Sequence, residues 1–496
     1  MAELLQQPAF EGSDILITGI THDSRQVRPG DLYVALPGRN VHGASFTAQA
    51  VAAGAVAVLT DRTGAPAGRG VPVIRADDPR AQLGRVAAYV YGEPARDLLM
   101  LGITGTNGKT TTGYLVECGL RAAGHRAGLI GTIETRVGDE QFASVRTTPE
   151  ATELHALLAV MRERGATACV MEVSSHALVL GRVDGIVYDI AGFTNLSQDH
   201  LDFHADLEDY FAAKAALFTA QRSRRGVVVV DDDYGRRLAE QAEIPVVTVS
   251  IHDDADWQVT KYEAGESGSS RATLEHRRDG RHHVVRSPIP GDFNVANAVL
   301  AVVMLLEAGV DAESAVHGVS TCSGVPGRME RVRSTGADEP LAVVDYAHTP
   351  DAIENVLLAL RPSTRGRLVV VVGAGGDRDP HKRAAMGAAS ARNADLVIVT
   401  DDNPRSENPA AIRAAVLDGA RTVTSQRGQL LEIGDRRAAM VRAVEATQSR
   451  ADTVVVVGKG HEQGQEIGGV VYPFDDRVVL REALEWVNDH RDQELR

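Results

Sequence analysis

The sequence is short of cysteine, and this shortage excludes two kinds of structural support. Three cysteines occur among 496 residues, at Cys118, Cys169 and Cys322. They are widely spaced and lie in apolar or small-residue segments, so the sequence indicates neither a disulfide framework nor a Cys-x-x-Cys metal site. A reducing compartment fits this composition best. We therefore expect a cytoplasmic protein.

A basic excess and long hydrophobic runs are also missing. Lys and Arg number 52 against 67 Asp and Glu, which gives a formal charge of -15. This is the wrong sign for a protein that grips nucleic acid phosphates, so we expect no nucleic acid partner. No stretch approaches the roughly 18 apolar residues of a membrane span. Segment 1–8 lacks the basic and apolar regions of a signal peptide, so we expect neither export nor membrane insertion.

The sequence contains many short runs of Val, Ile and Leu. Many end in Gly, Asp or Asn and precede an Ala-rich amphipathic stretch, a pattern typical of buried parallel strands joined by crossover helices. The pattern predicts a doubly wound α/β fold. The runs that show it best are 98–104, 168–173, 187–194, 227–231, 368–373, 396–401 and 454–458.

The length of the chain predicts more than one domain, because 496 residues exceed what one hydrophobic core organises. Segment 91–95 has the composition of a linker, and segment 331–340 turns polar and carries Gly and Pro. Residues 252–286 alternate charged, Gly and β-branched residues, which favours antiparallel strands attached to the central part. We predict an N-terminal α/β domain at 1–97, a central domain at 98–331 and a C-terminal domain at 332–496.

A glycine-rich loop lies between a strand and a helix at the start of the central domain. Its sequence is Gly105-Thr106-Asn107-Gly108-Lys109-Thr110-Thr111. Backbone amides and the helix dipole can bind phosphates there, Lys109 can reach the β and γ oxygens, and Thr110 can offer its hydroxyl to Mg²⁺. The strict pattern GxxxxGK[ST] needs Gly where Ile103 stands, so an ordinary glycine-rich turn is the alternative. We predict binding of ATP or GTP.

Candidate metal ligands follow two further strands. Glu172 ends one apolar run, and ligands of open α/β sheets bind at the carboxyl ends of strands. Asp199-His200-Leu201-Asp202 follows the next strand, and His200 is its best candidate ligand. Lys214 lies in an apolar helical stretch, where a lysine that reaches solvent is the ordinary explanation. The pattern predicts a metal site on Glu172 and His200 and leaves the role of Lys214 open.

Further polar motifs lie toward the C-terminus. Asn294 and Asn297 occupy adjacent turns of one helix face, where they could contact adenine or phosphate or serve as structural caps. The stretch from Gly373 to Arg378 lacks the GxGxxG spacing, which disfavours a dinucleotide site. Two motifs at strand ends favour ligand contact over turn formation. They are Asp402-Asn403-Pro404-Arg405 and Gly458-Lys459-Gly460-His461-Glu462.

Taken in order, these motifs closely resemble the Mur ligases over nearly the whole chain. The resemblance implies an N-terminal domain that holds a UDP moiety, a central P-loop ATPase-like domain and a C-terminal Rossmann-like domain that delivers an amino acid. The Asp402–Arg405 motif resembles the signature of members that add meso-diaminopimelate, as opposed to lysine, to a UDP-linked muramoyl dipeptide. The motifs that carry the resemblance are Thr104–Thr111, Glu172–His176, Asp199–Asp202, Gly291–Asn297, Gly327–Glu330 and Asp345–Asp351.

The same resemblance implies roles for individual residues. For ATP they are the Gly105–Thr111 loop, Asn294, Asn297, Arg328, Asp345 and His348. For the UDP substrate they are Ser24, the His42–Gly43 region, Thr147, Thr148, Ser174 and Arg182, with Leu180 where some relatives carry Gln. For diaminopimelate they are Arg378, Asp402, Asn403, Pro404, Arg405, Gly458 and Glu462. For Mg²⁺ they are Thr110, Glu172, His200 and Lys214, the last as a CO₂-derived carbamate (N6-carboxylysine).

The resemblance also implies a mechanism for peptidoglycan precursor synthesis. A free carboxylate cannot form an amide because oxide is not a usable leaving group, so ATP first converts the D-Glu carboxylate to an acyl phosphate that the amine attacks. Lys109 and two Mg²⁺, held through Thr110, Glu172, His200 and carbamylated Lys214, would neutralise the developing charge. The alternatives are a lysine-adding ligase, a folate polyglutamylating ligase and a non-enzymatic nucleotide-binding regulator. We expect a monomer.

Overall fold

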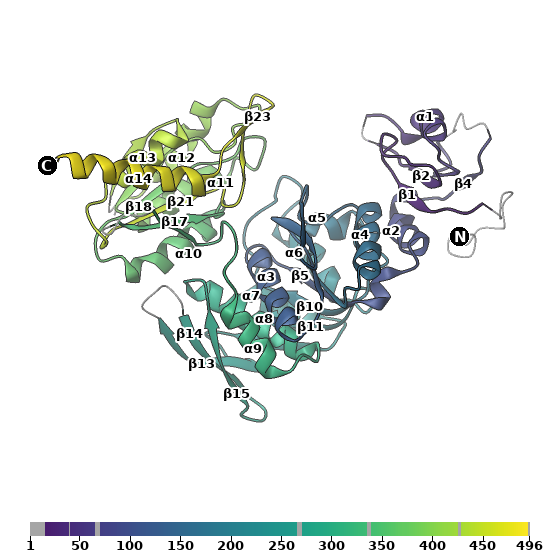
Figure 1. The fold of residues 1–496 in the computed structure, drawn as a ribbon, viewed down its shortest axis with the longest axis horizontal. Helices are drawn as coiled ribbons and strands as arrows, with labels where there is room; N and C mark the ends of the chain where they lie inside the picture. Colours follow the sequence, from purple (N-terminus) through teal and green to yellow (C-terminus); the bar gives the residue numbers. More distant parts are fainter. Residues whose placement is uncertain are drawn as a thin grey trace.

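The computed structural model describes residues 15–38, 40–64, 70–264, 270–334, 339–424 and 428–494. The predicted α/β fold is confirmed: three domains follow one another along the chain, each built on a sheet of its own (Figure 1). The segment 1–8 that bears on export, and part of the predicted linker at 331–340, lie outside the described residues. The domain limits at 97 and 331 stay predictions.

The N-terminal domain has a small parallel sheet in the strand order β1-β2-β3-β4. Its strands are β1 (Gly19–Thr21), β2 (Asp31–Ala35), β3 (Ala57–Thr60) and β4 (Val73–Arg75). Its helices are η1 (Gly43–Phe46), α1 (Thr47–Ala52), α2 (Pro79–Val90) and η2 (Pro94–Asp97). Helix α2 packs against α4 of the central domain, so the two domains meet there.

The central domain is built on an 11-stranded sheet in the order β15-β14-β13-β12-β11-β10-β5-β9-β6-β7-β8. Neighbouring strands from β13 through β6 in this order pair in parallel, and antiparallel pairing adds β14 and β15 at one edge and β7 and β8 at the other. The parallel strands are β5 (Leu99–Thr104), β6 (Ala127–Ile130), β9 (Ala168–Glu172), β10 (Tyr188–Phe193), β11 (Ser223–Val229) and β12 (Val246–Ser250). The edge strands are β7 (Glu134–Val137), β8 (Glu140–Ala143), β13 (Trp257–Ala264), β14 (Ser270–His276) and β15 (His282–Ser287), so the antiparallel stretch predicted at 252–286 is found.

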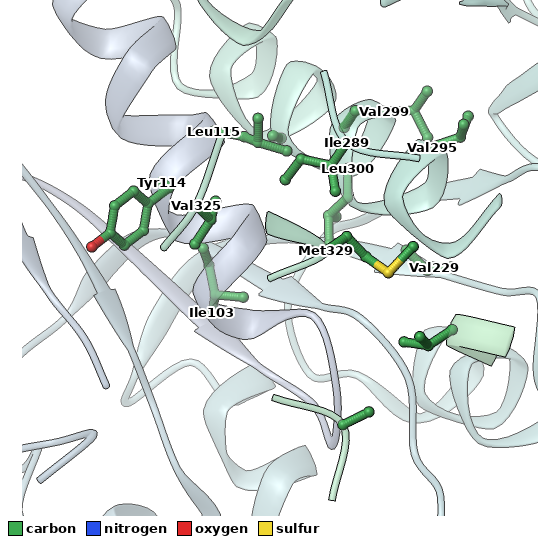
Figure 2. Packing of buried hydrophobic residues seen from close by; sticks show 14 of the residues in the cluster. Ile103, Tyr114, Leu115, Val229, Ile289, Val295, Val299, Leu300, Val325 and Met329 are labelled. Atoms are coloured by element: carbon green, nitrogen blue, oxygen red, sulfur yellow. The ribbon is translucent and has the colours of Figure 1, made fainter. Parts of the chain in front are cut away.

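Helices cover both faces of this sheet because successive strand residues point to opposite sides. On β5, Leu101 and Ile103 join a buried cluster with α3, α8 and α9, whereas Met100 joins one with α4, α6 and α7. Figure 2 shows Leu115 of α3 in the first cluster together with Leu300 of α8. The helices are α3 (Lys109–Ala122), α4 (Ala151–Glu163), α5 (Ser175–Val179), α6 (Leu207–Ala215), η3 (Ala216–Phe218), α7 (Asp233–Gln241), α8 (Asp292–Glu307) and α9 (Ala312–Thr321).

The C-terminal domain has a sheet in the order β16-β17-β21-β18-β19-β20, with helices on both faces. All neighbours are parallel except β16, which begins at Glu330, so the predicted limit at 331 falls inside a strand of this sheet. Its strands are β16 (Glu330–Val332), β17 (Leu341–Asp345), β18 (Leu368–Val372), β19 (Leu396–Val399), β20 (Gln429–Glu432) and β21 (Thr453–Val457), with a separate hairpin of β22 (Gly464–Ile467) and β23 (Val470–Pro473). Its helices are α10 (Pro350–Leu360), η4 (Arg361–Ser363), α11 (Lys382–Asn393), α12 (Pro409–Arg421), α13 (Arg436–Glu445) and α14 (Asp476–Glu494).

Helix length and polarity bear on the membrane question. Among the described residues, no helix combines the length and the apolar character that crossing a membrane requires.

A fully buried ion pair fixes the strand ends of the C-terminal domain. Arg436 at the start of α13 contacts Asp476 at the start of α14, and both side chains are 0% exposed. The Arg436 guanidinium also donates to the carbonyl of Val457, the last residue of β21. The pair therefore ties both helices to the carboxyl end of the sheet, where the Gly458 loop begins.

We expect Asp476→Asn to destabilise the C-terminal domain by about 3–5 kcal/mol, because the arginine would stay buried without its counter-charge. Urea unfolding followed by circular dichroism measures the change. Glu445→Gln is the matched control: it removes a carboxylate from an exposed pair with Arg442 and should cost less than about 1 kcal/mol. Equal stability of the two variants would contradict a structural role for the buried pair.

Candidate active site

The glycine-rich loop joins β5 to α3, in the strand, loop and helix order that the sequence predicts. Gly105 and Gly108 have φ angles of 144° and 87°, and a Cβ at these positions would clash with Thr194 and Asn297 respectively. The first N–H groups of α3 have no acceptor within the helix and point out of its N-terminus, as phosphate binding requires.

Thr194 and Asn195, which follow β10, hold this loop in place through hydrogen bonds. Asn195 accepts a hydrogen bond from the Thr106 N–H at 2.9 Å through its backbone carbonyl, and one from the Asn107 N–H at 3.0 Å through its side chain. The Thr194 hydroxyl donates to the Asn107 carbonyl at 2.6 Å. Two loop amides are thus already satisfied, and the loop is held in shape before any nucleotide arrives.

Two lysines meet at the loop. Lys109 Nζ donates to the carbonyls of Gly105 and Thr106, both at 2.9 Å. Lys214 Nζ donates to the same Gly105 carbonyl at 2.7 Å and lies 4.4 Å from the centre of the Tyr210 ring. Burial lowers the pKa of Lys109, and burial together with the charge of Lys109 holds the pKa of Lys214 well below its usual value. Since Lys214 is 1% exposed, it is not a lysine that reaches solvent.

Thr110 and Glu172, two of the expected metal ligands, are in contact. The Thr110 hydroxyl donates to Glu172 Oε2 at 3.0 Å. Glu172 also accepts from the N–H and the hydroxyl of Thr132, at 2.7 and 3.0 Å, and is 1% exposed. The sequence analysis missed Thr132, because no motif surrounds it. Three polar groups therefore fix one carboxylate beside the first turn of α3.

His200 lies in the loop after β10 with a left-handed φ of 57°, and its ring is 5.0 Å from that of His176 and 6.0 Å from that of Tyr210. Burial lowers the pKa of His200 to about 3, so its imidazole is neutral and could accept a metal ion. Among the described residues, no group of three or more His, Cys, Asp or Glu lies close enough to hold a metal by itself. Mg²⁺ would therefore also need the Thr110 hydroxyl, a modified Lys214 and phosphate oxygens.

Asp199, next to His200, reaches the C-terminal domain. Its carboxylate lies 3.4 Å from Lys382 Nζ and 3.8 Å from His348 Nε2. Burial alone would raise the pKa of Asp199, but the charges of His200, His348 and Lys382 hold it below its usual range. No motif in the sequence pointed to Lys382, which is the first residue of α11. This contact brings His348, expected at the ATP, to the edge of the central site.

The two asparagines of α8 are buried and bonded to each other. Asn297 Nδ2 donates to Asn294 Oδ1 at 3.2 Å, and Asn294 Nδ2 donates to the Pro290 carbonyl at 2.7 Å. The Thr112 hydroxyl of α3 donates to Asn297 Oδ1 at 3.3 Å. In the structure these amides hold α8 against the phosphate-loop helix. This is a structural role, one of the two alternatives that the sequence left open; the other is nucleotide contact.

Arg328 points from the C-terminal domain toward the phosphate loop. Its Nη2 donates to the Thr110 hydroxyl at 3.3 Å, and its guanidinium lies 4.3 Å from the centre of the Tyr346 ring. Nη1 is buried and has no hydrogen-bond partner among the described residues. Both carboxylate oxygens of Asp345 accept hydrogen bonds from the protein itself: the donors are the N–H groups of Met329 and Ala347, both at 2.7 Å. A buried, unsatisfied guanidinium nitrogen beside the loop fits a phosphate.

The residues expected at the dipeptide lie beside Glu172. Thr148 donates to the Glu172 carbonyl at 2.8 Å and lies 3.3 Å from the Ser174 hydroxyl, while the Thr147 hydroxyl lies 3.0 Å from that of Thr132. Arg182 Nη1 donates to the Thr148 carbonyl at 3.3 Å. Ser24, expected at the uridine diphosphate, lies in the N-terminal domain after β1.

His42 and Gly43 are bonded within the N-terminal domain. The Tyr33 hydroxyl donates to the Gly43 carbonyl at 2.9 Å, and His42 Nε2 lies 3.2 Å from Asp61. Leu180, where some relatives carry Gln, is the residue that ends α5 and offers no side-chain hydrogen bond.

The expected amino acid site lies at the carboxyl ends of β18, β19 and β21. Asn403 connects the motif after β19 with the one after β21. Its Oδ1 accepts from Lys459 Nζ at 2.9 Å, and its Nδ2 donates to Glu462 Oε2 at 2.8 Å. Asp402 is 7% exposed and follows β19, whereas Gly458 follows β21. Lys459, fully buried and 3.0 Å from Glu462, was part of a motif noted in the sequence but received no role there. The Glu462 carboxylate is thus already paired.

Arg405 has a left-handed φ of 53° in this site. Its Nη1 donates to the Gly376 carbonyl at 2.6 Å, and its Nε lies 3.3 Å from Glu466 of the β22–β23 hairpin. Glu407 pairs with Arg383 through two hydrogen bonds of 2.9 and 2.8 Å, so it is not the partner of Arg405. Arg378 is exposed and follows the Gly373–Gly376 stretch. Cationic and anionic side chains therefore lie together at one sheet edge.

Family models match all three domains: the Mur ligase family catalytic domain at residues 16–91, the Mur ligase middle domain at 103–305 and the Mur ligase glutamate ligase domain at 327–460. A protein of Streptomyces avermitilis is 57% identical over 98% of this chain and 96% of its own length, and one of Corynebacterium glutamicum is 49% identical over 96% and 93%. The chain belongs to the Mur ligase family. As a Mur ligase it is an ATP-dependent ligase.

Both of these relatives are named UDP-N-acetylmuramoyl-L-alanyl-D-glutamate--2,6-diaminopimelate ligase. A solved structure of a ligase with that name is 33% identical to this Mur ligase, with a TM-score of 0.66 and coverage of 97% of this chain and 96% of the other. Folylpolyglutamate synthase of Mycobacterium tuberculosis in complex with ADP and AMPPCP has a TM-score of 0.61 at 20% identity over 77% of this chain and 92% of its own. That likeness shows a shared fold only.

Proposed function

We propose that this Mur ligase joins meso-diaminopimelate to the D-Glu carboxylate of UDP-N-acetylmuramoyl-L-alanyl-D-glutamate in the cytoplasm, with ATP as co-substrate. The observation that carries the proposal is the amino acid site at the carboxyl ends of β18, β19 and β21. There Arg405 and Arg378 supply cations beside Gly375, and Asp402 and Glu462 supply carboxylates after the neighbouring strands β19 and β21. Diaminopimelate has a zwitterionic distal end, and such an end needs both signs in its site.

In the phosphoryl transfer step, the phosphate loop presents backbone N–H groups and Lys109 to the nucleotide, and Arg328 offers its unsatisfied Nη1. These donors face the charge that develops as the D-Glu carboxylate attacks, so they stabilise the transition state more than the ground state. Mg²⁺, held by Thr110, Glu172, His200 and a carbamylated Lys214, would neutralise phosphate charge when bound. The amine then displaces phosphate from the acyl phosphate.

The surroundings of Lys214 support carbamylation. An amine must be neutral to attack CO₂, and burial, with the charge of Lys109, lowers the pKa of Lys214 and so favours the neutral amine. The reaction forms an N–C bond and releases one proton. Its product carries a carboxylate in place of a second ammonium, which would repel Lys109. The new anion lies near the phosphate loop, and oxygen ligands of this kind suit Mg²⁺.

One ligation assay tests the proposed function. Purified protein, ATP, Mg²⁺ and the UDP-linked dipeptide are incubated with meso-diaminopimelate, lysine or glutamate, and the products are identified by mass. We expect the diaminopimelate adduct and release of ADP. A lysine adduct would indicate the lysine-adding ligase, and a product from folate and glutamate would indicate a polyglutamylating ligase. ATP hydrolysis that is independent of both substrates would support a nucleotide-binding regulator.

Arg405→Ala should remove most of the preference for diaminopimelate over lysine. Lysine lacks the distal carboxylate, so it offers Arg405 no anionic partner beyond Glu466, and we expect the wild-type preference in kcat/KM to be at least a few hundred-fold, on the order of 3 kcal/mol. The measurement is kcat/KM for both amines in wild type and variant. Arg421→Ala, an exposed arginine paired with Asp418, is the control. An unaltered preference in Arg405→Ala would remove Arg405 from the site.

A further inference from the structure

Glu150 joins two domains at the edge of the substrate site. It is the N-cap residue of α4 and is separated from Thr147 and Thr148 by Pro149 alone. Its Oε1 lies 2.8 Å from Nη2 of Arg182, and its Oε2 lies 3.1 Å from Nη1 of Arg80, which belongs to α2 in the N-terminal domain. The side chains of Glu150 and Arg182 are 9% and 13% exposed, so their ion pair is largely shielded from water, whereas Arg80 is 39% exposed.

Arg182 depends on this carboxylate. Its Nη1 donates to the Thr148 carbonyl, its Nη2 pairs with Glu150, and its Nε is buried without a hydrogen-bond partner among the described residues. Burial, and then the nearby charges of Arg146 and Arg80, lower the pKa of Arg182, while Glu150 raises it. Two arginines thus pair with one carboxylate while the charge of Arg146 also acts on Arg182, and this surplus of positive charge fits an anionic ligand. Without Glu150, Arg182 and Arg80 would repel each other.

A second contact joins the N-terminal domain to the same turn of α4. His22 Nδ1 lies 3.3 Å from the hydroxyl of Thr152, two residues after Glu150. His22 is also two residues before Ser24, the residue expected at the uridine diphosphate. The start of α4 therefore connects the part of the site expected to hold the nucleotide end of the substrate with the part expected to hold its peptide end.

We propose that Glu150 is a positioning residue for the UDP-linked substrate: it orients the Arg182 guanidinium toward an anionic group of that substrate and, through Arg80, ties this guanidinium to the N-terminal domain. The inference rests on the proposed function, because it takes a UDP-linked dipeptide as the ligand. Glu150 does not itself touch the reacting atoms. Its contribution is to substrate affinity, and the chemical step depends on other residues.

The experiment measures binding of UDP-N-acetylmuramoyl-L-alanyl-D-glutamate by calorimetry without amine or ATP, and then steady-state kinetics. Glu150→Gln keeps the size of the side chain and a cap acceptor but removes the charge. We expect its Kd and KM for the UDP-dipeptide to rise on the order of tenfold, with kcat changed less than about threefold and the KM for ATP unchanged. Arg80→Gln removes only the tie to the N-terminal domain and should weaken binding less.

Glu153→Gln is the matched control. It removes a carboxylate from the same helical turn, but this carboxylate makes no ion pair with Arg182. We expect wild-type binding and wild-type kinetics from it. Wild-type affinity in Glu150→Gln, or a loss of kcat with unchanged KM, would overturn the inference. Failure of the wild-type protein to bind the UDP-dipeptide would instead overturn the proposed function. The two failures are distinguishable because the wild type is measured first, without the amine.

Discussion

Lys214→Ala should abolish ligation while leaving the fold intact. The Lys214 side chain is 1% exposed, reaches the Gly105 carbonyl at 2.7 Å and has a pKa held well below its usual value by burial and by Lys109. If it carries a carbamate, the variant loses an anion from the magnesium site, and such a loss leaves the phosphates poorly neutralised. We expect turnover to fall by at least about 10³-fold, as for other groups that stabilise transition-state charge.

Chemical rescue separates a missing carboxylate from a missing side chain. Alanine leaves a cavity beside Tyr210, so formate or acetate at high concentration should restore part of the activity of Lys214→Ala. Lys214→Met is the control: its side chain fills the same space without a charge, and we expect equal loss without rescue. A carbamate carbon signal from labelled bicarbonate in the wild-type protein would support the proposal directly. Normal turnover of either variant, or a bare amine in an active substrate-bound crystal, would exclude it.

Lys109→Ala should lower kcat by about 10²–10³-fold, a loss of about 3–4 kcal/mol of transition-state stabilisation. Lys109 is the cation of the phosphate loop, and its amine now bonds only the carbonyls of Gly105 and Thr106, at 2.9 Å. These two acceptors hold the amine inside the loop, where phosphate oxygens would arrive. Single-turnover formation of ADP measures the effect on the chemical step.

Affinity for the UDP-dipeptide is the internal control for Lys109→Ala, because the residues expected to bind it lie on other segments. We expect that affinity to be unchanged. Lys261→Ala serves as the matched variant, since Lys261 is 69% exposed on strand β13 and pairs with Glu263. Near-normal turnover of Lys109→Ala would show that the loop does not act on a transferred phosphoryl group.

The sequence predicted the layout of the fold because its signals are local. Buried parallel strands are continuous apolar runs, and the loop motif needs a strand before it and a helix after it, so β5, α3 and the order of the domains followed from neighbouring residues alone. The antiparallel strands β13–β15 were likewise visible in the alternation of residues 252–286. The limit predicted at 331 falls inside β16, because this strand joins the C-terminal sheet by pairing with β17.

Motifs in the sequence also named many of the candidate site residues, but they gave no partners. Glu172 and Thr110 are 62 positions apart, and the chain order does not reveal that they share a hydrogen bond. Thr132, which holds the same carboxylate, stands in no motif. Contacts of this kind form when strand ends from distant segments meet at one sheet edge, and residue types alone do not encode that meeting.

By itself, the sequence determined the fold class, the phosphate loop and the family resemblance, because each rests on a pattern of adjacent residues. The tertiary structure decided how charges are paired: Lys214 beside Lys109, Glu407 with Arg383 and away from Arg405, and Glu150 between two arginines of different domains. Charge pairing depends on distance and burial, and both are set only when the domains pack. The same packing lowers the pKa of Lys214, a property that no motif contains.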